Sequence, residues 1–261
     1  MFAATMIALG ILGLIKGNYT PAWQPIPQAV PTYEVLAYLC ACISVACGLG
    51  LLWQRTAVIA ARVLLAYLLI WVAVFRVPEV LPAPMVLGSW YSCAESAVIV
   101  AGAWVLYAWC AAAWDRRHLG FATGNKGVRI ARALYSLSLI FFGTSHFVYL
   151  DQTTPLVPGW LPSHLFWAYL TGGAYIAAGV AILIGVSAGL AAVLAAFQIG
   201  MFTLLVWLPI VAAGSHDPFQ WSETILSWVL TAAAWVLADS YRVRPLACDY
   251  VNLSASSNQS S

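Results

Sequence analysis

Long apolar segments recur along this chain, and each one ends near a proline, a glycine or a charged residue. Segments of this length predict helices near 2–16, 34–53, 57–77, 88–112, 131–149, 164–184, 187–209 and 221–240. Most of these approach the roughly 20 residues that a helix needs to cross a bilayer, although the first is shorter. The pattern therefore predicts an all-α, polytopic membrane protein with about eight transmembrane helices.

The two ends of the chain need separate interpretation. The apolar run at 2–16 resembles a signal peptide, but no basic residue precedes it and no clear small-residue cleavage site follows. We therefore expect it to be the first membrane helix. Residues 241–261 form a predicted cytoplasmic tail, and the Ser- and Asn-rich end of this tail, from Asn252, is typical of disorder.

The second half of the chain repeats features of the first half at a distance of 131 positions. This shift pairs Pro78 with Pro209 and Trp90 with Trp221. Matched alanine and leucine are common between membrane helices, whereas matched proline and tryptophan are not. The alternative is chance similarity between apolar helices. We favour a tandem duplication with parallel four-helix repeats at 1–112 and 131–240, joined by a basic linker at 113–130.

Composition supports a membrane protein and excludes several other classes. The chain is 63% hydrophobic and 8% charged, against roughly 25% charged residues in an ordinary soluble domain. Lipid is therefore the expected solvent. A net charge of +2 gives no reason to expect a nucleic-acid partner.

The positions of the basic residues predict an orientation. In the eight-helix topology, Lys16 and Arg76 fall on one side of the membrane and Arg62 lies within the third helix. The other side carries Arg55, Arg116, Arg117, Lys126, Arg129, Arg132, Arg242 and Arg244. Because cytoplasmic loops are enriched in basic residues, we expect the linker and both termini to be cytoplasmic, in a bacterial plasma membrane.

Two histidines are candidates for a site near the outer face. An ionisable group inside a bilayer is costly, so each one is a candidate functional residue. His146 lies near the outer end of the fifth helix, with Lys16 close to the matching position of the first helix. An imidazole there could bind a metal, a haem or a quinone carbonyl, or transfer protons. The alternative is an interfacial histidine bonded to a nearby carbonyl. His164 opens the sixth helix.

Three charged residues within the helices are weaker candidates. Glu223 falls in the predicted first turn of the eighth helix, where the helix dipole alone would stabilise a carboxylate. Glu95 lies about two turns into the fourth helix, and we expect it to pair with Arg76 or Lys16. Arg62 lies in the third helix, where it either extends to the cytoplasmic surface or marks a cavity between the repeats.

No complete catalytic or metal-binding motif accompanies these residues. None of the six cysteines forms a CxxC pair, and the sequence has no HExxH helix, nucleotide-binding glycine loop or hydrolase motif. We therefore expect no protein-bound metal and do not expect the chain to be an enzyme on its own.

Three segments of the second repeat resemble the DoxX-like membrane proteins. They are 143–149 (GTSHFVY), 157–162 (VPGWLP) and 167–172 (WAYLTG). The resemblance is good over about 130–240 and weaker over 1–108. It implies a four-helix unit, duplicated here, and a link to quinone-coupled or other membrane redox systems. By that resemblance His146, Trp160 and His164 would line an outer-face site. Such a resemblance in fold does not establish a reaction.

Three functional hypotheses follow. The first is an accessory or quinone-associated subunit of a membrane redox system, with quinone or haem as candidate cofactors and lipids and other redox subunits as partners. The second is a small-molecule transporter or permease with a site between the repeats, for which Arg62, Gln198 and Glu95 are the candidate polar residues. The third is a non-catalytic membrane scaffold.

Overall fold

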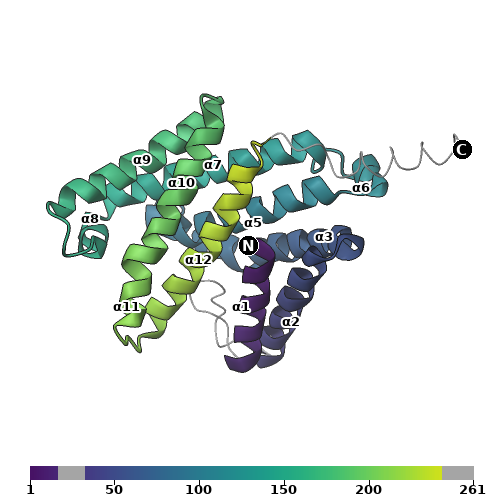
Figure 1. The fold of residues 1–261 in the computed structure, drawn as a ribbon, viewed down its shortest axis with the longest axis horizontal. Helices are drawn as coiled ribbons and strands as arrows, with labels where there is room; N and C mark the ends of the chain where they lie inside the picture. Colours follow the sequence, from purple (N-terminus) through teal and green to yellow (C-terminus); the bar gives the residue numbers. More distant parts are fainter. Residues whose placement is uncertain (17–32, 243–261) are drawn as a thin grey trace, which may run out of the picture.

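A computed structural model describes residues 1–16 and 33–242 of the chain (Figure 1). Within these two ranges the chain forms helices and no strand, as the hydrophobic pattern predicts. The predicted outer loop between the first two helices and the predicted disordered tail from Asn252 lie outside the described residues.

Helices follow one another along both halves of the described chain. The first half forms α1 (Phe2–Lys16), α2 (Tyr33–Leu52), α3 (Gln54–Trp71), the π-helical η1 (Val72–Arg76), α4 (Val77–Val80), the 3-10 helix η2 (Leu87–Trp90) and α5 (Tyr91–Cys110). A short helix, α6 (Ala113–His118), follows. The second half forms α7 (Gly124–Val148), α8 (Leu150–Thr153), the 3-10 helix η3 (Thr154–Leu156), α9 (His164–Ile184), α10 (Ala188–Phe202), the π-helical η4 (Thr203–Trp207), α11 (Leu208–Ala212) and α12 (Pro218–Asp239).

Six of these helical segments are long and apolar enough to cross a membrane, which identifies an integral membrane protein. They are Tyr33–Leu52, Gln54–Val80, Leu87–Cys110, His164–Ile184, Ala188–Ala212 and Phe219–Asp239. The segment Gly124–Val148 meets the criterion only together with Leu150–Leu156, from which it is bent by 91°. The apolar helix at the N-terminus is shorter than a full span.

Three helices, α3, α7 and α12, begin three or more residues earlier than the sequence predicts, while α1 and α9 have the predicted bounds. α7 begins at Gly124 rather than at 131, so part of the predicted linker is helical. Its first turns carry Lys126 and Arg129, and these charged residues lie outside the apolar run from which the helix was predicted. α12 begins at Pro218 rather than at 221, after Asp217 caps it by accepting a hydrogen bond from the Phe219 N–H.

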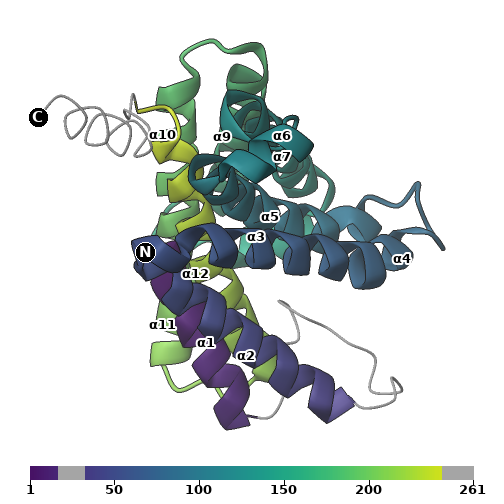
Figure 2. The same cartoon turned by 90° about the vertical axis from the view of Figure 1, so that its right-hand side faces the viewer.

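α5 and α12 form the centre of the molecule (Figures 1 and 2). In the span of each, 61% of the residues are buried, against 28–39% in the other four spans. The two helices meet at Gly102, where an added Cβ would lie 3.0 Å from the Cβ of Ala233. Small residues at this point let the two backbones approach closely, as is common between membrane helices.

Two helical hairpins flank this centre. α1 lies against α2, and α7 lies against α9 (Figure 1). At Gly143 of α7, an added Cβ would come within 2.4 Å of the Gly172 carbonyl oxygen, so the α7–α9 contact requires glycine at this position. α7 also packs against α5, and α1 against α12, so the first helix of each half contacts the last helix of the other.

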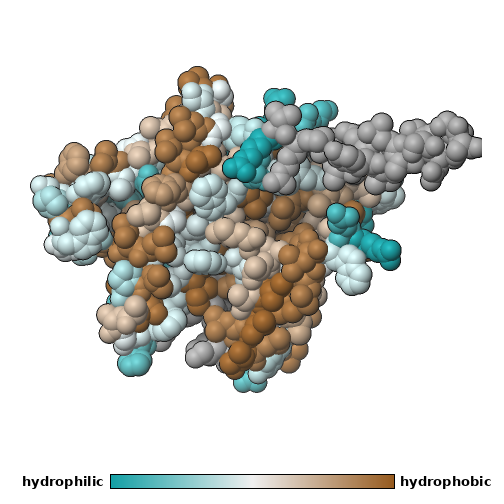
Figure 3. Space-filling model, in the orientation of Figure 1, coloured by the Kyte–Doolittle hydropathy of each residue, from teal (hydrophilic) through white to brown (hydrophobic). Residues whose placement is uncertain are grey.

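The outer surface is strongly apolar, as Figure 3 shows along α1, α2 and α10. Large side chains such as Ile15, Leu39 and Leu190 are more than half exposed on these helices. Apolar surface of this extent would be unfavourable in water, and it is the surface that lipid requires.

Candidate ligand-binding site

Three of the six predicted site residues line one cavity between α5, α7 and α12. Glu95, His146 and Glu223 face this inner cavity of about 100 Å³. The rest of its wall is largely aromatic or aliphatic and includes Tyr91, Phe142, Tyr175, Phe202, Trp207 and Leu226. A wider vestibule of about 720 Å³ shares the three polar residues with the inner cavity and extends past Thr153 and Gln152 of α8.

The two ring nitrogens of His146 have different surroundings. Nδ1 lies 2.8 Å from the Phe142 carbonyl oxygen, which can only accept, so Nδ1 carries a proton and donates it. Nε2 is buried and has no hydrogen-bond partner among the described residues. The hydrogen bond to a nearby carbonyl, which was the alternative interpretation of this histidine, is therefore present at Nδ1, while Nε2 has no partner among the described residues.

The position of His146 depends on its neighbours in the fold. The ring contacts Tyr175 and Phe202 nearly edge-to-face, with centroids 5.5 and 5.9 Å away. Gly172 of α9 lies opposite, and an added Cβ there would be 2.7 Å from the Cβ of His146. A larger residue at 172 would displace the imidazole, so this glycine makes room for it.

Glu95 does not form the ion pair that its sequence position suggests. Its side chain is 5% exposed, and it has no ion pair within the described ranges. Arg76, the expected partner, donates from Nε to the Ser96 hydroxyl and forms an ion pair with Glu79 at 3.2 Å. The second expected partner, Lys16, lies at the end of α1 and does not line the cavity. Glu95 instead lines the inner cavity.

Glu223 also differs from its sequence interpretation. Because α12 begins at Pro218, Glu223 lies in the second turn of the helix rather than in the first. The helix dipole acts mainly within the first turn, so it does not explain this carboxylate. Glu223 instead lies in the wall of the inner cavity.

A polar stripe on α12 includes two residues, Ser227 and Thr231, that were not among the predicted site residues. Glu223, Ser227 and Thr231 are spaced four residues apart, so they lie on one face of the helix. Ser227 lines the inner cavity, and its hydroxyl and that of Thr231 lie 2.6 and 3.1 Å from the hydroxyl of Thr203. This spacing is visible in the sequence and would have indicated which face of α12 carries the site.

Trp160 and His164 lie elsewhere. Trp160 is 70% exposed, and His164 is the partly buried first residue of α9. Neither residue lines the inner cavity or the vestibule. The group that the family resemblance implies, His146 with Trp160 and His164, is therefore not brought together.

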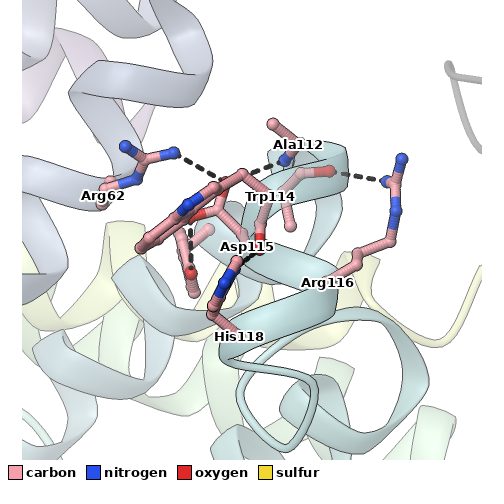
Figure 4. Close-up of polar contacts among 8 residues, drawn as sticks. Arg62, Ala112, Trp114, Asp115, Arg116 and His118 are labelled. Carbon is pink, nitrogen blue, oxygen red and sulfur yellow. Dashed lines mark hydrogen bonds and ion pairs between the residues drawn. The ribbon is translucent and has the colours of Figure 1, made fainter.

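Arg62, the remaining predicted residue, forms an ion pair with Asp115 of α6 (Figure 4), and α6 lies at the opposite side of the molecule from α8 (Figure 1). Its Nη2 lies 2.8 Å from the buried Asp115 carboxylate of α6, and its guanidinium lies over the Trp114 ring. Asp115 also accepts hydrogen bonds from the Ala112 N–H and the Tyr107 hydroxyl. Burial raises the pKa of Asp115, but the hydrogen bonds from Arg62, Ala112 and Tyr107 outweigh it and hold the pKa below its usual value.

Neither a metal-binding arrangement of side chains nor a similarity to known proteins adds to the description of this site. In the part of the chain that the structure describes, no group of three or more His, Cys, Asp or Glu residues is arranged to hold a metal ion. No family model, curated protein or solved structure matches this chain. The resemblance to the DoxX-like proteins therefore stays a prediction.

Proposed function

We propose that this membrane protein binds a small quinone-type ring, in its hydroxyl-bearing quinol form, as an accessory subunit of a membrane redox system. The observation that carries the proposal is the free, buried Nε2 of His146 in a cavity that also holds two carboxyl groups. The accessory role follows the DoxX-like resemblance.

The donor and acceptor pattern of the cavity suits a quinol. Because Nδ1 of His146 donates to Phe142, the neutral ring has its lone pair on Nε2 and can accept a hydrogen bond from a ligand hydroxyl. Glu95 and Glu223 provide carboxyl oxygens that can accept from a second hydroxyl. An unsatisfied buried polar atom is costly, so a ligand that satisfies Nε2 gains from that contact.

The shape of the cavity suits one ring better than a macrocycle. At about 100 Å³ the inner cavity is smaller than the roughly 300–1,000 Å³ of drug-sized pockets, so it admits a single ring and not a porphyrin. Aromatic walls from Tyr91, Tyr175 and Phe202 offer ring contacts. The vestibule has room for the rest of the ligand.

Co-purification tests this proposal. The protein would be purified in mild detergent, and its lipid extract assayed for quinones by chromatography and absorption. We expect quinone in the wild-type extract and at least tenfold less with His146→Ala, while the matched variant His164→Ala, outside the cavity, retains it. No quinone in the wild type, or full retention in His146→Ala, would overturn the proposal.

One observation favours a second candidate, a transporter or permease. Glu95 comes from the first half of the chain, and His146 and Glu223 come from the second, so the cavity lies between the halves. The other candidate residues contribute less: Arg62 pairs with Asp115, and Gln198 donates to the Thr171 carbonyl. Solute flux into liposomes that is lost in Glu223→Gln would favour this candidate.

We also propose that the two halves are repeats of one four-helix unit, with eight membrane-crossing helices. Three correspondences at the predicted shift of 131 support this. The π-helical segments begin at Val72 and Thr203, α2 and α9 begin at Tyr33 and His164, and the central contact joins Gly102 to Ala233. This contact lies where an axis relating the halves would pass.

In the proposed repeat, the first helix needs a shift of 133. Gly10 of α1 lies against Ala41 and Val45 of α2, and Gly143 of α7 lies in the same way against Gly172 and Ile176 of α9. The two glycines are 133 positions apart, whereas their partners on α2 and α9 are 131 positions apart. The counterpart of His146 is then Gly13 rather than Lys16. The first half therefore has no imidazole at the position that matches His146.

Orientation remains part of the proposal. The basic residues favour both termini and α6 in the cytoplasm of a bacterial cell, with the vestibule toward the outer face.

A further inference from the structure

A wide basic groove lies at the opposite end of α7 from His146. Lys126 and His146 are twenty residues apart on this helix, which corresponds to about 30 Å, the thickness of the hydrocarbon core of a bilayer. The groove has a volume of about 1090 Å³ and lies between the start of α7, the end of α9 and the start of α10. It therefore lies at the membrane surface opposite the vestibule.

Three cations line the groove, and none of the described residues in its wall is acidic. Lys126 and Arg129 are exposed and form no ion pair with any residue of the described ranges. Arg132 is fixed in place: it donates to the hydroxyl and the carbonyl of Ser240, and its guanidinium stacks 3.6 Å from the Tyr241 ring. A fixed guanidinium beside two free cations forms a positive site for an anion.

The backbone adds to this positive potential. Gly185 and Ser187 adopt positive φ angles in the turn between α9 and α10, and the Ser187 hydroxyl makes no capping hydrogen bond. Ala188 and Gly189, whose N–H groups have no partner within the helix because they lie in its first turn, line the groove. A helix N-terminus carries a partial positive charge, so it reinforces the charge of the side chains.

Part of the groove wall is apolar and exposed. Ile130, Leu183 and Leu190 line it, and their side chains are 38%, 49% and 62% exposed. A ligand that fills the groove must therefore present a negative charge to the cations and hydrocarbon to these side chains. A free inorganic anion would satisfy only the first of these two requirements.

We propose that this groove is a binding site for an anionic phospholipid. The phosphate lies against Arg132, with Lys126 and Arg129 at its sides, and the acyl chains pass over Leu183 and Leu190. Basic pockets between membrane helices recognise such headgroups by this chemistry. This site is separate from the proposed quinol cavity and does not depend on it.

Lipid-dependent stability tests the proposal on the full chain. Purified protein in neutral detergent would be titrated with dioleoylphosphatidylglycerol or dioleoylphosphatidylcholine while its thermal unfolding midpoint is measured, and lipid retention would be followed by native mass spectrometry. We expect the anionic lipid to raise the midpoint and to be retained, with the neutral lipid having little effect. In the double variant Lys126→Gln/Arg129→Gln, affinity should fall about thirtyfold, since each cation near the surface is worth roughly fivefold.

A charge-matched control separates the groove from the overall charge. The double variant Arg55→Gln/Arg117→Gln removes the same charge from two exposed residues outside the groove and should keep wild-type affinity. Equal loss in both double variants would overturn the proposal in favour of general attraction. An equal shift from inorganic phosphate alone would overturn it in favour of a free-anion site, and no shift from the anionic lipid would leave the groove without this function.

Discussion

At the scale of single residues, the sequence identified the ionisable groups but not their surroundings. His146, Glu95 and Glu223 could be singled out because charge inside a bilayer is costly. The free Nε2 of His146 could not, because it depends on a carbonyl one turn away and on Gly172 in another helix. Trp160 was selected by resemblance alone, and the structure places it on the surface.

Asp115 gives a prediction about pH at this scale. Its pKa in the folded protein lies below the usual value, so its contribution to stability is present above that value, near pH 4, and is lost as the pH falls through the folded-state pKa. We expect the thermal midpoint of the wild type to fall more steeply below about pH 4 than that of Asp115→Asn. The measurement is the midpoint of each protein across this acid range.

The Asp115→Asn variant should also be less stable at neutral pH, because Arg62 and Tyr107 lose a charged acceptor. Glu34→Gln, which removes a carboxylate from the start of α2, serves as the control. Parallel acid profiles for the wild type and Asp115→Asn would show that this carboxylate does not contribute in the way described.

At the scale of elements, helix positions follow from the sequence because an apolar run is a local feature. The bounds of α1 and α9 agree with the prediction, whereas α3, α7 and α12 begin earlier. The π-helical segments were not predicted. Each segment ends two residues before a proline, Pro78 in the first half and Pro209 in the second. A proline lacks the N–H that its preceding turn needs, so the chain widens locally, but several geometries can accommodate this loss.

The contact between α7 and α9 gives a prediction for Gly143→Ala. The new methyl group would lie 2.4 Å from the Gly172 carbonyl oxygen and 2.9 Å from the Ile176 nitrogen, both of which belong to backbone. We expect the free energy of unfolding to fall by about 1–3 kcal/mol, the usual cost of overpacking. Denaturation in mixed detergent micelles would measure it.

Gly173→Ala is the matched control for this variant. A Cβ at Gly173 meets no atom within 4 Å, and alanine is favoured over glycine inside a helix, so stability should stay level or rise by up to about 1 kcal/mol. An equal loss in both variants would argue against close packing at Gly143.

At the scale of the whole molecule, the arrangement of helices depends on contacts that no local pattern specifies. Glu95 and Glu223 share a cavity only because α5 and α12 meet at Gly102 and Ala233. Periodicity places each carboxylate on its own helix, but it does not say which helices meet. The class of fold could therefore be predicted, while the convergence of the site could not.

The proposed orientation predicts which loops are accessible from each side of the membrane. In a variant lacking the six native cysteines, Met85→Cys and Arg117→Cys would be labelled with a membrane-impermeant maleimide. The cysteine of Met85→Cys, at a position where the native side chain is 96% exposed, should react in intact cells. The cysteine of Arg117→Cys should react only after the membrane is opened. Labelling of both positions in intact cells, or the reverse pattern, would contradict the orientation.

The most direct test of the shared site is a double-mutant cycle between Glu95 and His146, which come from different halves of the chain. Binding of decylubiquinol would be titrated by quenching of tryptophan fluorescence in the wild type, Glu95→Gln, His146→Ala and the double variant. If both side chains contact one ligand, each variant weakens binding and the losses are not additive, with a coupling of about 0.5–3 kcal/mol. Wild-type affinity in both single variants, or strictly additive losses, would contradict a single cavity formed by the two halves.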